Sequence, residues 1–239
     1  MNKPLALSRR SFLVTVTAAG ATFALTGAAE AADGYAPTIW YSIDRTGAVN
    51  VNIIRAEMGQ HVGTAIARIV ADELEADWSK VTFTHVDTDP KWGLMVTGGS
   101  WSVWQSYPLY SQAAAAGRIA LINAGAKLLG AKPEACVARN GAVHAGKKSV
   151  TYGQIVAKGQ LAGAVSDADL AKTPIKKAAD RRLIGKPAPN RDIPGKTNGA
   201  GIYGLDAKVP GMVYARPILP PTRYGSRVEL VDDTAAKAI

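Results

Sequence analysis

Cysteine is almost absent from this sequence, since the 239 residues include only Cys136. A single thiol cannot form an internal disulfide, and it cannot supply the four thiolates that hold a typical iron–sulfur cluster. We therefore expect no iron–sulfur cluster on this chain. Any electron carrier of that kind would have to lie on another polypeptide.

Histidine is also scarce. His61, His85 and His144 are widely spaced, and only His85 has an aspartate close by in the sequence. Zinc sites take several ligands, in structural sites often at short and regular sequence spacings. We therefore expect no metal site, and the default for these side chains is a solvated or hydrogen-bonded imidazole.

The sequence has no long run of charge of one sign, although its net charge is +9. Its small basic clusters, at 176–177 and 181–182, are not interleaved with aromatic residues, which argues against nucleic-acid binding. We expect no nucleic-acid partner. Scattered basic residues fit better with an anionic cofactor or an acidic partner subunit.

The N-terminus resembles an export signal. Arg9 and Arg10 precede an uncharged stretch over 12–29, and Ala29-Glu30-Ala31 fits a signal-peptide cleavage site. The match to the twin-arginine signal of bacteria is completed by Ser8, Phe12 and Leu13. We expect residues 1–31 to be such a signal, with the mature protein, of net charge +7, in the periplasm or on the periplasmic face of the inner membrane. An uncleaved membrane anchor is the alternative, because the uncharged stretch approaches the length that spans a bilayer.

Hydrophobic periodicity predicts an α+β fold with helices packed on a mixed sheet. Short runs of alternating apolar residues predict strands, and apolar residues at helical spacing predict helices. Ser106 is a plausible N-cap for the second helix, with Pro108 in its first turn and Gly130 at its end. The expected elements are strands over 38–44, 48–54 and 80–88 and helices from Val62 to Leu74 and from Ser106 to Gly130.

The second half of the chain predicts further parts. Asn140-Gly141 indicates a hairpin, and a short helix is expected near 153–158. Residues 163–198 are rich in Pro, Lys, Asp and Gly and are expected to form an extended connector. The segment over 199–239 has the pattern of paired strands of a new unit without an apparent end, so a domain over 32–162 precedes the connector and an incomplete one follows it.

Two glycine-containing turns each lead into a predicted helix. The first contains Met58, Gly59 and Gln60, and the second is the segment TGGSWS at 97–102. Helix N-termini offer unpaired backbone N–H groups and the positive end of the dipole, so anions bind there. If the helices lie side by side on one sheet, both turns open at the same end and could hold a pyrophosphate or a polar heterocycle. Ordinary helix-entry turns are the alternative.

Three tryptophans lie in and beside the second turn, namely Trp92, Trp101 and Trp104. Indole rings grouped in this way could wall an aromatic pocket or form a subunit contact. Packing over the sheet is the other interpretation.

Several stretches together carry a resemblance to a known family. EMGQ precedes a helix ending in ADELEADWSKV, and TGGSWSVWQS precedes an alanine-rich helix. This combination resembles the molybdopterin-binding subunit of the xanthine dehydrogenase and aldehyde oxidoreductase family, in particular the exported branch with isoquinoline 1-oxidoreductase beta subunits and membrane-associated aldehyde dehydrogenases. Residues 182–221 are similar to the entry of that family's α/β hammerhead domain.

The resemblance implies a cofactor, a molybdenum-molybdopterin dinucleotide in its cytosine form. By position, Gly59 and Gln60 would meet the pterin side, and the second turn would bind phosphate or neighbouring cofactor oxygens. The residues assigned to that second contact are Thr97, Gly98, Gly99, Ser100 and Ser102. His61 stands where many relatives have glycine, so the contact at that position is open.

The resemblance also implies an activity. The complete enzyme would oxidise aldehydes or N-heterocyclic aromatics with water-derived oxygen and pass electrons to a subunit with two [2Fe-2S] clusters, with a cytochrome c subunit as a further partner. The surroundings of the family's catalytic glutamate have no match here, so we expect an N-terminal part that is inactive alone. The alternatives are an exported, non-catalytic binding module for a small aromatic ligand and a remnant that folds poorly.

Overall fold

The computed structural model describes residues 14–17, 20–23, 34–158, 161, 172–222 and 224–238. The chain divides into two units, one up to Asn198 and one from Gly199 onward. The predicted signal peptide lies largely outside the described residues. Within it, the strands β1 (Val14–Thr17) and β2 (Gly20–Phe23) pair antiparallel.

The main sheet of the first unit has four strands in the order β3-β4-β5-β6. The pair β4–β5 is antiparallel, as predicted, and β6 is parallel to β5. Alternate residues of β5 are buried, so one face of the sheet joins the core. The bounds are Gly34–Thr38 for β3, Tyr41–Asp44 for β4, Val49–Ile53 for β5 and Val81–His85 for β6.

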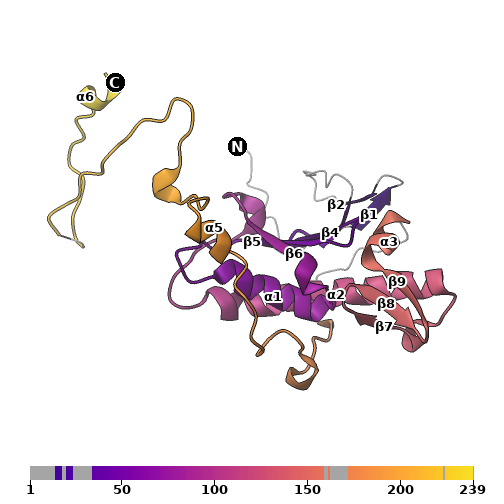
Figure 1. Cartoon of the computed structure of the whole chain (residues 1–239). Helices are drawn as coiled ribbons and strands as arrows, with labels where there is room; N and C mark the ends of the chain where they lie inside the picture. Colours follow the sequence, from indigo (N-terminus) through magenta and orange to yellow (C-terminus); the bar gives the residue numbers. More distant parts are fainter. Residues whose placement is uncertain are drawn as a thin grey trace. The chain divides into compact units, whose positions relative to one another are not determined.

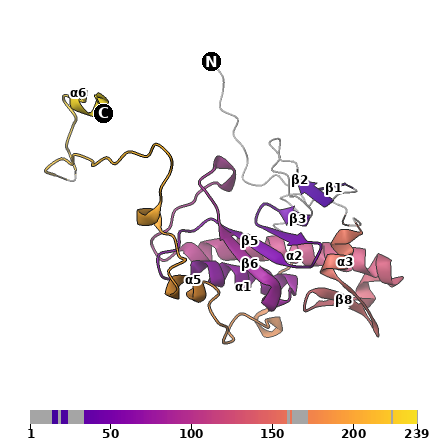
Figure 2. The ribbon, with the colours of Figure 1, turned by 45° about the horizontal axis from the view of Figure 1, so that its top comes forward.

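Two helices lie side by side on one face of this sheet (Figures 1 and 2). Helix α1 (Val62–Leu74) connects the parallel strands β5 and β6, the usual role of a crossover helix. Helix α2 (Ser102–Leu129) packs beside it, and its alanine-rich middle is buried. Small side chains there allow a close approach of the two helices. In the described part of the chain, no helix has both the length and the apolarity of a membrane span.

The predicted start of the second helix is wrong. Helix α2 begins at Ser102, after Trp101, whereas Ser106 is a buried residue inside the helix. Pro108 therefore lies within the helix instead of in its first turn. The proline suggested a later start because proline favours a first turn. In the structure the helix starts earlier, directly after the turn that contains Gly98 and Gly99.

A second, three-stranded sheet packs against the C-terminal half of α2. Its first turn confirms the predicted hairpin, because Asn140 and Gly141 both have the positive φ that a two-residue turn requires. The Tyr152 hydroxyl donates to the Leu74 carbonyl oxygen at the end of α1, at 2.6 Å. The elements are β7 (Val137–Arg139), β8 (Ala142–Ala145), β9 (Lys148–Thr151) and the short helix α3 (Tyr152–Ala157).

The expected connector over 163–198 is a packed element where the structure describes it. Residues 172–198, here called the strap, bind α1 through buried charges and contain a short helix, α5 (Ile193–Thr197). Glu73 of α1 is fully buried and accepts from the Arg181 guanidinium at 2.6 Å. Asp72 accepts from the backbone amides of three consecutive strap residues, 182–184. Some of the basic residues in the clusters at 176–177 and 181–182 are therefore paired with acidic groups of α1 inside the fold.

The second unit does not contain the expected paired strands. The structure assigns no strand to residues 199–222 and 224–238, which contain the short helix α6 (Thr234–Lys237). Large apolar side chains such as Leu205 and Ile218 are fully exposed. Alternating apolar residues form strands when another layer covers them, and the described residues of this unit provide no such layer.

Candidate functional site

The two glycine turns are joined to each other. The backbone amide of Ala56 donates to the Thr97 hydroxyl oxygen at 2.8 Å, and Arg55 Nη1 donates to the Val96 carbonyl oxygen at 2.5 Å. Arg55 lies two residues after the end of β5 and also reaches into α2, where its Nε donates to the Ser106 hydroxyl at 3.3 Å. Both helices therefore begin near the carboxyl end of β5, as expected if both turns open at one end.

Arg55 is a site-organising residue that sequence reasoning missed. Its side chain is buried, and Nη2 also donates to Gln105 Oε1 at 3.1 Å. Burial lowers the pKa of this guanidinium, but an arginine remains charged at neutral pH. The sequence signal that could have identified Arg55 is a charged residue just beyond a buried strand and before a turn.

The second turn leaves its hydrogen-bond donors free. In the described part of the chain, the backbone amides of Gly98, Gly99, Ser100 and Ser102 donate to no acceptor, and neither do the two serine hydroxyls. Gly99 and Ser100 have φ values of 57° and 58°. Successive residues in turn conformations of this kind orient their N–H groups toward one region, a common basis of anion binding. A Cβ built on Gly98 would meet nothing within 4 Å, so the backbone here is open to a ligand.

The first turn, in contrast, uses its donors internally. The Glu57 carboxylate accepts from the amides of Gly59 at 2.7 Å, His61 at 3.2 Å and Val62 at 3.1 Å. The Gln60 side chain folds back, accepting from the Met58 amide and donating to the Ala56 carbonyl oxygen. Gly59 has a φ of 103°, which strongly favours glycine. Of the predicted residues here, Gly59 is open to approach and Gln60 is already hydrogen-bonded.

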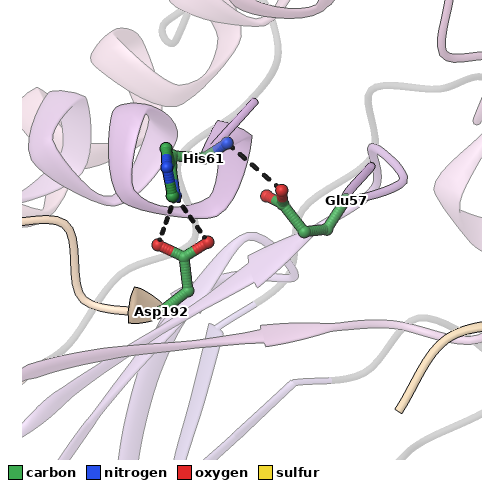
Figure 3. A group of neighbouring side chains, drawn as sticks. All are labelled: Glu57, His61 and Asp192. Carbon is green, nitrogen blue, oxygen red and sulfur yellow. Dashed lines mark hydrogen bonds and ion pairs between the residues drawn. The ribbon is translucent and has the colours of Figure 1, made fainter. Parts of the chain in front are cut away.

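Glu57, His61 and Asp192 form a cluster of polar side chains at the first turn (Figure 3). His61 Nδ1 donates to both carboxylate oxygens of Asp192, each at 2.9 Å, and Lys196 Nζ contacts the carboxylates of both Glu57 and Asp192. The ligand atoms of Glu57, His61 and Asp192 all lie within 4.8 Å of one another, a spacing that suits a metal ion. The Lys196 ammonium already supplies the positive charge between these carboxylates. The sequence could not indicate this cluster, because His61 and Asp192 are 131 residues apart.

The cluster holds its carboxylates in the charged form. Burial raises the pKa of Asp192, but hydrogen bonds from Lys196 and His61 outweigh it and lower the pKa to about 2. Burial likewise opposes ionisation of Glu57, whose pKa is nevertheless lowered by Lys196 and the amides of Gly59 and His61. Burial opposes the charge of Lys196, but hydrogen bonds to Asp192 and Glu57 together outweigh it and raise the pKa of Lys196.

The two turns therefore differ in how well their residues fit an anionic dinucleotide. The second turn offers free amides, free hydroxyls and an open glycine backbone, which suit phosphate oxygens. Thr97 accepts from Ala56 through its hydroxyl oxygen and keeps its own O–H available. The first turn offers open space at Gly59 but no free amide between 58 and 62, apart from Gln60, in the hydrogen bonds of the described chain.

A small pocket of about 360 Å³ lies next to this site. Its walls are mostly apolar, with the Trp40 and Trp92 rings 5.8 Å apart. Trp101 has a buried indole nitrogen without a hydrogen-bond partner in the described chain, and Trp104 is 65% exposed. The pocket-wall role predicted for the tryptophans thus has a geometric basis at Trp92. The lining residues are Trp40, Ile54, Arg55, Lys91, Trp92, Leu94, Gln105 and Leu109.

Comparison with known families identifies the class of protein to which this site belongs. A family model described as a molybdopterin cofactor-binding domain matches residues 8–187. The chain belongs to this family, and the resemblance read from the sequence is confirmed.

Individual relatives agree with this assignment. The membrane-bound aldehyde dehydrogenase [pyrroloquinoline-quinone] of Gluconacetobacter polyoxogenes is 55% identical over 98% of this chain and 32% of its own length. The beta subunit of isoquinoline 1-oxidoreductase from Brevundimonas diminuta is 31% identical over 98% of this chain and 36% of its own. A nicotinate dehydrogenase subunit from Pseudomonas putida is 32% identical over 69% of this chain and 14% of its own. The chain thus spans only about a third of the first two relatives and less of the last.

Proposed function

We propose that this chain is the N-terminal part of the molybdenum-cofactor-binding large subunit of a molybdenum hydroxylase acting on aldehydes or N-heterocyclic aromatics. The family match and the names of the relatives support the proposal. The structural observation that carries it is the open, donor-rich turn at 97–102, joined through Thr97 to the turn at 56–60.

The residues of this chain act by binding and positioning. The free amides at 98–100 and the hydroxyls of Ser100 and Ser102 donate to phosphate oxygens at the start of α2, where the helix dipole favours negative charge. Arg55 fixes the loop that carries these donors. When bound, the cofactor supplies the oxidation chemistry itself, in which oxygen from water is added to the substrate and two electrons are removed.

The finer parts of the proposal concern the cofactor form and the partners. We assign the cytosine dinucleotide, an iron–sulfur subunit with two [2Fe-2S] clusters and a cytochrome c subunit as a further electron acceptor. The single cysteine supports the assignment of the clusters to another chain.

A cofactor analysis of the natively purified complex tests the proposal. We expect molybdenum by inductively coupled plasma mass spectrometry and, after acid release, a stoichiometric cytidine nucleotide. Gly98→Ala should preserve the fold, because the added methyl meets nothing within 4 Å, and should lower both contents by obstructing the ligand. Gly195→Ala, which also meets nothing, is the matched control. A complex that contains neither molybdenum nor nucleotide contradicts the proposal.

The same preparation decides between two cofactors. One relative is named for pyrroloquinoline quinone, whereas the family model describes a molybdopterin domain. We expect no quinone in the chain's own binding site. Stoichiometric quinone without molybdenum in an acid extract would favour the other cofactor.

The isolated chain should be inactive. Purified residues 32–239, supplied with cofactor, are expected to give no dye reduction with aldehydes or N-heterocycles. Robust turnover by this polypeptide would show that the remaining catalytic parts are not needed.

A second candidate function is supported by the pocket beside Trp92. Its apolar walls and the Lys91 ammonium, 5.0 Å from the Trp92 ring centre, suit a small aromatic ligand. An exported binding module would bind such a ligand in the absence of any cofactor. Tryptophan fluorescence titration with benzoate and quinoline tests it, with Trp92→Leu as the variant that should abolish quenching and Trp104→Leu as the exposed control.

Export by the twin-arginine route is the proposed localisation. A fusion of the full chain to a reporter should appear in the periplasmic fraction. Replacing both Arg9 and Arg10 by lysine should retain the reporter in the cytoplasm, while Lys3→Ala should not. Equal export of the twin-lysine variant contradicts this route.

A further inference from the structure

The Glu57 carboxylate occupies the place that an external anion would take at the start of α1. It accepts three backbone N–H groups, from Gly59, His61 and Val62. Its side chain is only 12% exposed. The first turn of the helix thus has an internal anion that belongs to the chain itself.

Glu57 is fixed from the strap as well as from the turn. Lys196 Nζ contacts Glu57 Oε1 at 2.7 Å and also contacts Asp192, which in turn binds the His61 ring. Arg191 donates its backbone amide to the Thr64 hydroxyl, so the strap also binds the first turn of α1. The carboxylate is therefore held in one position, and it shares the Lys196 ammonium with Asp192.

These contacts make the two turns chemically different. A phosphate approaching the start of α1 would have to displace Glu57 from three amides and would then lie beside a carboxylate of the same charge, which is unfavourable. A phosphate approaching the second turn meets free amides. The two glycine turns by themselves allowed an anion at either helix start, whereas the family resemblance placed the pterin side at the first turn and phosphate at the second.

We propose that Glu57 is a positioning residue that fills the amide nest of the first turn and thereby directs the phosphates of the cofactor to the second turn. This proposal rests on the proposed function and deepens it. Glu57 fixes Gly59 and Gln60 for contact with a neutral part of the cofactor, and Lys196 holds Glu57 in place. The two turns divide the ligand between them, one taking uncharged heteroatoms and the other the phosphates.

The first test uses the full chain without cofactor and inorganic pyrophosphate as the probe. In nuclear magnetic resonance titrations, wild-type amide shifts should be confined to residues 98–104. Glu57→Ala frees three amides, so shifts at 59, 61 and 62 should appear, with roughly tenfold tighter binding at that turn, about 1.4 kcal/mol. Glu57→Gln keeps an acceptor in place and should behave like the wild type. Glu134→Gln, at an exposed glutamate, is the control.

The second test measures cofactor retention in the native complex. Glu57→Ala should retain about tenfold less nucleotide per chain, and Glu57→Gln should restore most of it. Lys196→Met, which removes the partner of Glu57 without changing the turn, should give an intermediate loss. The Lys196→Met variant also tests the proposal if Glu57→Ala fails to fold.

The outcomes separate this proposal from the proposed function. A wild-type complex without molybdenum or nucleotide overturns the proposed function, whereas the pyrophosphate titration still reports on Glu57. Wild-type pyrophosphate shifts at 59, 61 and 62, or unchanged retention in Glu57→Ala, overturn the role of Glu57 even if the cofactor is present.

Discussion

The Ala56 amide and the Thr97 hydroxyl oxygen form a 2.8 Å hydrogen bond across 41 residues of sequence. This bond joins the two turns that we propose as the cofactor site. Without it, the turns would be held together near this point mainly by the bonds of Arg55 to the Leu94 and Val96 carbonyl oxygens before the second turn.

Thr97→Val should therefore destabilise the apo chain as well as the site. The substitution keeps the shape but removes the acceptor, leaving the Ala56 amide without its partner at a cost of about 1 kcal/mol. Chemical denaturation measures the free energy of unfolding. Ser102→Ala removes a hydroxyl that has no partner in the described chain, so its free energy of unfolding should stay within about 0.5 kcal/mol of the wild type. Equal effects of the two changes would contradict the role of the bond.

The ionic contacts between α1 and the strap predict a large effect at Glu73. This fully buried carboxylate lies 2.6 Å from an Arg181 nitrogen and 3.7 Å from an Arg118 nitrogen. Glu73→Gln removes the negative charge and leaves the buried Arg181 guanidinium without its counter-charge, which costs about 3–5 kcal/mol. Thermal unfolding should show a correspondingly lower midpoint, whereas the exposed Glu134→Gln should not. A small effect at Glu73 would mean that the strap is held mainly by other contacts.

Gly153 makes a close backbone contact that only glycine permits. A Cβ at this position would lie 2.5 Å from the Arg45 carbonyl oxygen and 2.8 Å from the Gly47 nitrogen. Neither atom is a flexible side chain, so Gly153→Ala should cost about 1–3 kcal/mol through overpacking. Gly195→Ala meets nothing within 4 Å and is the reference. Similar unfolding midpoints for the two variants would contradict the predicted clash.

Acid should weaken the attachment of the strap at Asp192. The folded pKa of this carboxyl is lowered to about 2 from 3.8, so its contribution to stability is complete above about pH 4 and is lost as the pH falls toward 2. Asp192→Asn should be less stable at pH 7, on the order of 1–2 kcal/mol after allowance for partial exposure, and should lose less stability between pH 4 and pH 2. Free energies of unfolding measured across this window give the comparison. Parallel pH profiles for the two chains would contradict it.

Local patterns predicted the local parts of this fold. Alternation of apolar residues located the β4–β5 hairpin, helical spacing located α1, and Asn140-Gly141 located the turn between β7 and β8. Each of these signals is contained in a few consecutive residues. The start of α2 was missed because Pro108 and Ser106 imitate a helix start, although the glycine turn before them begins the helix.

Contacts between polar groups far apart in the chain could not be predicted from the sequence. The strap was predicted as a connector because its composition is polar, yet its charges have buried partners on α1 more than 100 residues away. The capping of α1 by Glu57 was missed for a different reason. Glycine turns were treated as open donors, and an acceptor five residues before the helix start can fill them.

The burial of the α1–strap contacts also bears on how such a protein can be handled. Exposed ion pairs weaken in concentrated salt because the Debye length falls to about 3 Å at 1 M, whereas buried pairs are screened far less. The contacts between α1 and the strap should therefore stay intact during extraction or chromatography in concentrated salt. Acidic elution would be the harsher treatment.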